Sequence, residues 1–193
     1  MVRKIKCQFN EQFERPNKKY TVVSFSVFYS PQYMRHFYKG EARNLTFIRQ
    51  MQFLYNLTLN IMLLEQKYIP DDWYYRIFYD KSLFTFSYNG KKPWKEFFDT
   101  YKNHPRVQLV EFTCPDFLID KNYHINLFGT ITRLYPIFQE DDNLELIIVF
   151  DADNVITRDY VEEIEKFKRT KYDYNTFCSR FEMSFYKHER TSD

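Results

Sequence analysis

The chain has 193 residues, three glycines and a net charge of +2. This length suits one domain with a sizeable core, and so few glycines exclude the glycine-rich phosphate loops of P-loop and dinucleotide-binding proteins. The near-neutral charge argues against a general polyanion binder, so no nucleic-acid partner is expected.

The N-terminal segment is basic. Residues 1–19 carry six Lys or Arg against two Glu. A solvated tail is the simpler explanation, and a contact with a partner or a membrane surface is the alternative. We therefore divide the chain into a basic tail, 1–19, and one domain, 20–193.

The cysteines bear on the compartment. Cys7, Cys114 and Cys178 are odd in number and widely spaced, which predicts reduced thiols in a reducing compartment. The sequence shows no apolar leader and no stretch long enough to span a membrane. A cytoplasmic protein without a transmembrane segment is expected.

Segments typical of strands and of helices alternate along the domain. Strands are expected at 20–29, 73–79, 107–112, 144–150 and 172–181, and helices at 44–67, 93–102, 126–135 and 158–168. The alternation predicts an α/β fold with a mostly parallel sheet flanked by helices. Ligands bind such sheets beyond the carboxyl ends of the strands, so Tyr29, Asp80 and Asp151 are expected near one rim.

Two of these helices carry further expectations. The helix at 44–67 is rich in Leu, Met and Phe and lacks Gly and Pro, so we expect it to be largely buried. Proline cannot donate a backbone hydrogen bond, so Pro136 should end or kink the helix at 126–135.

An apolar strand runs directly into two carboxylates. Residues 146–150 are followed by Asp151, Ala152, Asp153 and Asn154. Carboxylate oxygens suit Mg²⁺ or Mn²⁺, which keep several waters and bind substrate phosphates as well. A solvated turn is the alternative, because Asp and Asn are common in turns. The apolar strand entering Asp-x-Asp favours a metal site at Asp151 and Asp153.

The helix before that strand has a polar face. Asn126, Thr130 and Arg133 recur at helical spacing. The opposite side, expected to face the core, comprises Leu127, Ile131, Leu134 and Phe138. An arginine packed beside the acidic strand could reach the phosphates or sugar of a nucleotide substrate. Pairing with a surface carboxylate is an equally open explanation.

Four segments follow one another along the chain in a recognisable order. They are the strand at 20–29, the sequence Arg-Ile-Phe-Tyr-Asp ending at Asp80, the sequence Gly-Thr-Ile-Thr-Arg at 129–133, and the Asp-x-Asp at 151–153. This order resembles small glycosyltransferases of the GT-A type, especially those of large DNA viruses and bacterial surface-polysaccharide loci. The resemblance covers residues 20–180. It implies a single-domain GT-A fold and metal-dependent transfer of a sugar from a nucleotide-diphosphate donor, expected to be a UDP-sugar, to a glycan or protein acceptor.

The resemblance implies a role for the ends of the first two strands. Phe28, Tyr29 and Ser30 would cradle the base and ribose of the donor, and Asp80 would contact the base or ribose. For Tyr29 a core aromatic, and for Asp80 a turn aspartate, are equally open explanations.

The resemblance also implies roles at the acidic motif. Asp153 would coordinate Mn²⁺ or Mg²⁺ directly, and Asp151 would bind the ribose, or the metal through water. Thr130 and Arg133 would approach the donor.

No catalytic base is assigned by the sequence. Only 40 residues follow Asp153, and Glu182 and His188 are the late candidates. A small complete enzyme, a fragment of a longer transferase and a donor-binding remnant without catalysis all stay open. Beside a transferase and a nucleotide-sugar binder, an interaction module that uses the aromatic surface is a third class of function. A haloacid-dehalogenase-type phosphatase is disfavoured, because Asn154 and Val155 stand where that family has a Gly-Thr-type turn.

Overall fold

The computed structural model describes residues 6–29, 42–120, 123–124, 128–172, 174–178 and 182–187. Of the sequence-based candidates, Ser30, Asn126, Leu127 and His188 lie outside these residues, and the side chain of Glu182 is not described. No helix in the described part is both long and apolar enough to cross a membrane.

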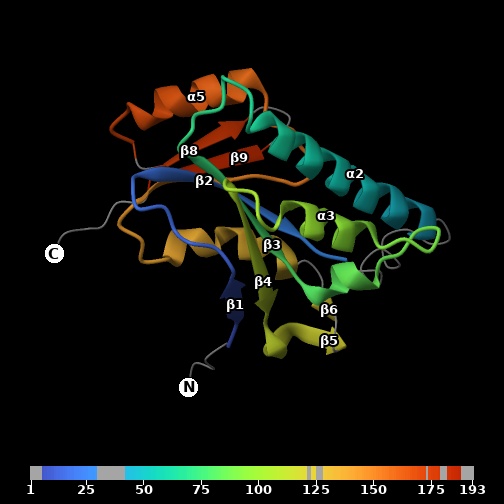
Figure 1. The fold of residues 1–193 in the computed structure, drawn as a ribbon. Helices are drawn as coiled ribbons and strands as arrows, with labels where there is room; N and C mark the ends of the chain where they lie inside the picture. The colour runs from blue at the N-terminus through green and yellow to red at the C-terminus, as the bar shows by residue number, and fades with distance from the viewer. Residues whose placement is uncertain are drawn as a thin grey trace.

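A sheet of seven strands forms the centre of the described residues, in the order β1-β4-β3-β2-β7-β9-β8 (Figure 1). The central strands β2 (Tyr20–Val27), β3 (Trp73–Tyr79), β4 (Val107–Thr113) and β7 (Leu144–Val149) are parallel. The outer strands β1 (Gln8–Glu11), β8 (Tyr174–Cys178) and β9 (Glu182–Lys187) pair antiparallel. A small second sheet joins β5 (Leu118–Asp120) to β6 (Tyr123–His124).

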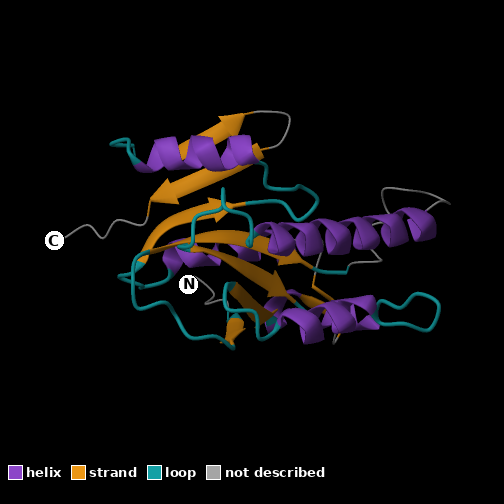
Figure 2. Cartoon of the chain, turned by 45° about the horizontal axis from the view of Figure 1, so that its top comes forward, coloured by secondary structure: helices purple, strands orange, loops and turns teal. Residues whose placement is uncertain are grey.

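Helices cover both faces of the main sheet (Figure 2). One face carries α2 (Ala42–Leu63), α3 (Pro93–Tyr101) and α5 (Arg158–Lys168), and the other carries α4 (Phe128–Ile131) and the 3₁₀ helix η3 (Thr132–Phe138). Short 3₁₀ helices η1 (Lys81–Thr85) and η2 (Pro115–Phe117) follow β3 and β4. The expected α/β fold is confirmed, with its parallel strands at the centre of a mixed sheet.

Strand β2 shows why both faces are covered. Alternate side chains point to opposite faces of a strand. Val23 and Phe25 belong to the larger core, which α2, α3 and α5 complete. Tyr20 and Val22 belong to a second core against η3. A strand that is apolar on both faces needs a layer of helices on each side.

Two segments differ from the sequence-based expectation. Residues 8–11, which were placed in the basic tail, form β1 at the edge of the sheet. The single strand expected at 172–181 is instead two antiparallel strands, β8 and β9. Short polar strands of this kind lack the apolar run that marks a central strand.

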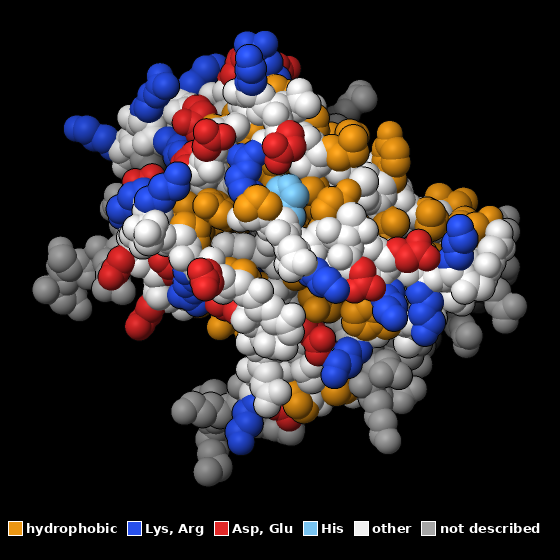
Figure 3. Space-filling view, in the orientation of Figure 1, with side chains coloured by type: hydrophobic (Ala, Val, Ile, Leu, Met, Phe, Trp, Pro, Cys, Tyr) orange, Lys and Arg blue, Asp and Glu red, His pale blue; other side chains and the backbone are white. Residues whose placement is uncertain are grey.

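Helix α2 was expected to be largely buried but is buried on one side only. Leu57 and Ile61 lie in the core, whereas Ile48, Tyr55 and Met62 are 57%, 68% and 60% exposed. These three are seven residues apart, which is close to two helical turns, so they form a line facing outward. Hydrophobic side chains accordingly gather on the surface over α2 (Figure 3). Apolar composition alone did not reveal this outward stripe.

Cys7 and Cys114 form a disulfide. Strands β1 and β4 pair with Gln8 opposite Thr113, so one further step along the register sets Cys7 opposite Cys114. The expectation of reduced thiols was therefore wrong for these two cysteines. Their separation of 107 residues in the sequence concealed a direct cross-strand pair.

Candidate functional site

The order of the parallel strands marks a position for ligand binding. Counted in chain order, they lie 3-2-1-4 across the sheet as β4-β3-β2-β7. The connections therefore reverse direction between β2 and β7. In doubly wound sheets the crevice at such a reversal, beyond the carboxyl ends of the strands, is where ligands bind. The segments that follow β2 and β7 define the candidate site.

The acidic motif forms a turn directly after β7. The N–H of Phe150 donates to the carbonyl of Ser24 at 3.0 Å, and the N–H of Asn154 donates to the carbonyl of Asp151 at 3.1 Å. Ala152 is buried, while Asp151 and Asp153 are partly exposed. The turn thus buries its alanine and leaves both carboxylate side chains in contact with solvent.

Helix η3 brings an arginine to this turn. The Nη1 of Arg133 donates to the Oδ1 of Asp151 and lies 3.5 Å from the carbonyl of Phe150. The side chain of Arg133 is 19% exposed and that of Asp151 is 42% exposed. Burial lowers the pKa of the Arg133 guanidinium, and the nearby Asp153 carboxylate opposes that shift. Arg133 and both aspartates therefore form one cluster of charge at the end of β7.

The backbone around Arg133 is fixed to the sheet. The hydroxyl of Ser24 donates to the carbonyl of Arg133 at 2.6 Å. Thr130 lies half-buried, one residue before an exposed Ile131. Ile131 and Phe138 were expected on the core side, and this was wrong. From Thr132 the chain tightens to three residues per turn and runs through Pro136, so the α-helical spacing no longer holds.

The segment after β2 forms the opposite side of the site. The carbonyl of Phe28 accepts a hydrogen bond from the Nε2 of Gln50 at 3.1 Å, and the N–H of Tyr29 donates to the hydroxyl of Ser82 at 2.8 Å. The Tyr29 ring is half-buried and meets the ring of Phe86 edge-on at 5.5 Å between centroids. One part of the Tyr29 ring therefore contacts the core and another part is exposed, so its contact with a donor base stays a prediction.

The ring of Phe28 lies against Gly129, and a Cβ at that glycine would overlap ring atoms of Phe28. We expect Gly129→Ala to lower the free energy of unfolding by about 1–3 kcal/mol, the cost of overpacking a close contact. Urea unfolding measures the change. In a Phe28→Ala background the same substitution should cost almost nothing, and a penalty that persists there would rule out this contact as the cause.

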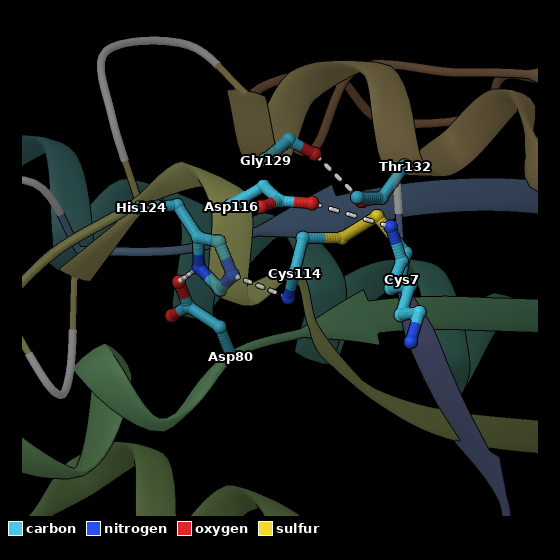
Figure 4. Close-up of a disulfide and its surroundings, with 8 residues drawn as sticks. Cys7, Asp80, Cys114, Asp116, His124, Gly129 and Thr132 are labelled. Carbon is cyan, nitrogen blue, oxygen red and sulfur yellow. Dashed lines mark hydrogen bonds and ion pairs between the residues drawn. A yellow bond between two sulfur atoms is a disulfide. The ribbon is translucent and has the colours of Figure 1, made fainter. Parts of the chain in front are cut away.

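Asp80 closes β3, but its carboxylate is buried and bonded within the protein (Figure 4). Its Oδ1 accepts hydrogen bonds from the backbone N–H and the hydroxyl of Ser82. Its Oδ2 lies 2.7 Å from the Nδ1 of His124. Strand β2 separates β3 from β7, so Asp80 is not part of the cluster at Asp151.

The other ring nitrogen of His124 identifies its tautomer. The backbone N–H of Cys114 donates to Nε2 at 3.0 Å, so Nε2 is an acceptor. The ring hydrogen therefore sits on Nδ1 and is donated to Asp80. His124 was not singled out from the sequence, because it lies in an irregular stretch whose partners are distant in the chain.

Two carboxylates are available for a divalent cation. Among the described residues, no three His, Cys, Asp or Glu side chains cluster closely enough to hold a metal ion by themselves. Mg²⁺ and Mn²⁺ are hard ions that often take one or two carboxylates and complete their shell with waters and substrate phosphates. Asp151 and Asp153 are carboxylates of the kind such an ion takes, and one oxygen of Asp151 already accepts a hydrogen bond from Arg133.

The chain matches no protein-family model, and no curated protein sequence matches it significantly. The inference of function therefore rests on the residues of the site and on the order of the strands that carry them.

Proposed function

We propose that this protein is a metal-dependent glycosyltransferase of the GT-A type. It transfers a sugar from a nucleotide-diphosphate donor, expected to be a UDP-sugar, to a glycan or protein acceptor. The observation that carries the proposal is the acidic turn at 151–153, which lies at the reversal of the parallel sheet and holds a partly buried arginine beside it.

The charges of this cluster match those of a diphosphate–metal complex. A divalent cation, when bound, supplies positive charge that stabilises the departing diphosphate. Asp153 and Asp151 would hold it. Arg133 has further N–H groups beyond the one donated to Asp151, and a guanidinium can donate to two phosphate oxygens at once. The site thus offers one ligand set for the cation and one donor group for the phosphates.

The nucleoside would lie along the neighbouring strand end. Phe28 and Tyr29 offer aromatic surface beside the reversal, which suits a flat base, and Ser30 stays a prediction for the same subsite. Asp80 enters the proposal as a support for the strand end, because both of its oxygens are already bonded. Thr130 precedes Arg133 on the same segment and stays a predicted donor contact.

Removal of the metal ligand tests the proposal. We expect Asp153→Asn to weaken UDP binding in Mn²⁺ at least a hundredfold, about 2.8 kcal/mol, because the cation loses its direct ligand. Isothermal titration of UDP with and without Mn²⁺ measures the effect. Asp159→Asn, in the exposed first turn of α5, is the matched control and should leave UDP affinity unchanged.

Two results would count against the proposal in different ways. Equal UDP affinity for Asp153→Asn and wild type in Mn²⁺ would remove the metal site. Tight Mn²⁺-dependent binding of UDP-sugars without any transfer or hydrolysis of the sugar would leave a nucleotide-sugar-binding protein instead of an enzyme.

A further inference from the structure

Two asparagines on the inner side of α2 hold the backbone of the acidic turn. The Nδ2 of Asn56 donates to the carbonyl of Asp153 at 2.6 Å. The Nδ2 of Asn60 donates to the carbonyl of Asn154 at 3.0 Å, and its Oδ1 accepts from the N–H of Ile156 at 2.8 Å. Three hydrogen bonds therefore join α2 to the backbone of Asp153, Asn154 and Ile156.

Asparagine is an unfavourable residue for stability at these two positions of α2. Asn60 is 0% exposed and Asn56 is 8% exposed, in the middle of a 22-residue helix. Asparagine is a poorer helix former than leucine, and a buried amide is unfavourable unless it is hydrogen-bonded. Four residues apart, the two side chains share one face of the helix. Their described partners are Asp153, Asn154 and Ile156, in the acidic turn and directly after it, so these two amides hold that segment.

The same helix also holds the other side of the site. Gln50, which is buried on α2, donates from Nε2 to the carbonyl of Phe28 and accepts from the Nε1 of Trp94 at 2.8 Å. Buried amides on one helix thus bond to the segment after β2 and to the segment after β7. These are the two segments that flank the reversal of the sheet.

We propose that Asn56 and Asn60 are positioning residues that fix the acidic turn so that the carboxylates of Asp151 and Asp153 converge on one cation. Neither asparagine side chain touches the ligand itself. The inference rests on the proposed function for the identity of that ligand. Groups that orient metal ligands in this way change metal affinity about tenfold to a hundredfold when they are removed.

The test uses leucine substitutions, because leucine has a similar volume, favours helix and removes only the hydrogen bonds. Asn56→Leu and Asn60→Leu should each weaken the binding of Mn²⁺ alone, titrated by electron paramagnetic resonance, about tenfold to a hundredfold. Gln50→Leu is the matched control. It removes a buried amide of the same helix whose described bonds go to Phe28 and Trp94 and not to the acidic turn, so the affinity for Mn²⁺ alone should stay unchanged.

A second measurement tests the hydrogen bonds of Asn60 without any metal. The N–H of Ile156 is bonded to Asn60, so its hydrogen exchange should be slow in wild type and faster in Asn60→Leu, whereas Gln50→Leu should leave it slow. Faster exchange at Ile156 together with weaker Mn²⁺ binding supports the proposal. Equal exchange at Ile156 in wild type and Asn60→Leu would show that Asn60 does not hold this segment, and would overturn its positioning role.

The remaining outcomes separate this inference from the proposed function. Wild-type protein that binds Mn²⁺, with Asn56→Leu and Asn60→Leu binding it equally well, overturns the positioning role and leaves the glycosyltransferase proposal intact. Wild-type protein that binds neither Mn²⁺ nor UDP in Mn²⁺ overturns the proposed function, and the role of the asparagines in metal binding with it.

Discussion

Opening the Cys7–Cys114 disulfide is expected to lower the free energy of unfolding by about 2–4 kcal/mol. The two cysteines are 107 residues apart, and the loop between them contains β2, β3 and β4. Joining such distant residues restricts the unfolded chain strongly, so cutting the bond releases a large conformational entropy in the unfolded state.

Urea unfolding of wild type with and without a reductant measures this effect, and Cys7→Ser should match the reduced protein. In the Cys7→Ser/Cys114→Ser variant the reductant should change nothing further, which controls for its action elsewhere. If oxidised and reduced wild type unfolded at the same urea concentration, the bridge would contribute no stability.

The disulfide is also connected to the candidate site by polar contacts. The N–H of Cys114 donates to His124, His124 donates to Asp80, and Asp80 accepts from Ser82, whose hydroxyl in turn accepts from the N–H of Tyr29. The bond therefore anchors one end of a chain of contacts that reaches the end of β2. Disulfides persist in oxidising compartments. This bond therefore argues against the cytoplasmic location expected from the sequence, which stays a prediction.

The sequence predicted best those elements whose pattern is local. The apolar run before Asp151 located β7 and its acidic turn, and the charged segment 158–168, expected as a helix, forms α5 with the same bounds. Each of these segments carries its own signal, because a buried strand or an amphipathic helix can be recognised without knowing its neighbours.

The sequence did not predict contacts between segments far apart in the chain. The pairing of Cys7 with Cys114 depends on the register of β1 against β4, and the pairing of Asp80 with His124 depends on β6. Asn60 resembles any polar residue of a helix until the acidic turn is folded against it. These features are decided by tertiary structure, so neither spacing nor composition carries them.

The buried arginine of β3 is the clearest such feature. Arg76 is completely buried on the face opposite α2. Its Nε donates to Gln108 at 2.8 Å, its Nη1 to Gln139 and its Nη2 to the hydroxyl of Tyr20 at 3.3 Å. The ring of Phe13 lies 5.0 Å from the guanidinium carbon. Burial is the largest influence on the pKa of the Arg76 guanidinium and lowers it, while Tyr20 opposes that shift.

The charge of Arg76 is balanced through its neighbours. Burial raises the pKa of Tyr20 to about 12, so its hydroxyl is protonated. The hydroxyl donates a hydrogen bond to the carboxylate of Asp141 at 2.6 Å. Arg15 lies 3.7 Å from Asp141 and 2.9 Å from Glu11. Two arginines and two carboxylates thus form one network, which joins the segment after β1 to the middle of the sheet.

We expect Arg76→Ala to lower the free energy of unfolding by about 3–5 kcal/mol, the scale of breaking a buried charged network. The substitution opens a cavity and removes the guanidinium that donates to Gln108, Gln139 and Tyr20. Urea unfolding measures the change. Arg76→Met fills most of the volume but donates nothing, so it should recover the cavity part of the lost stability and not the hydrogen-bond part.

Arg158→Ala is the control. It removes an arginine whose only described ion pair is exposed and should change the free energy of unfolding by less than about 0.5 kcal/mol. If Arg76→Ala fell within that range, the network would not stabilise the fold.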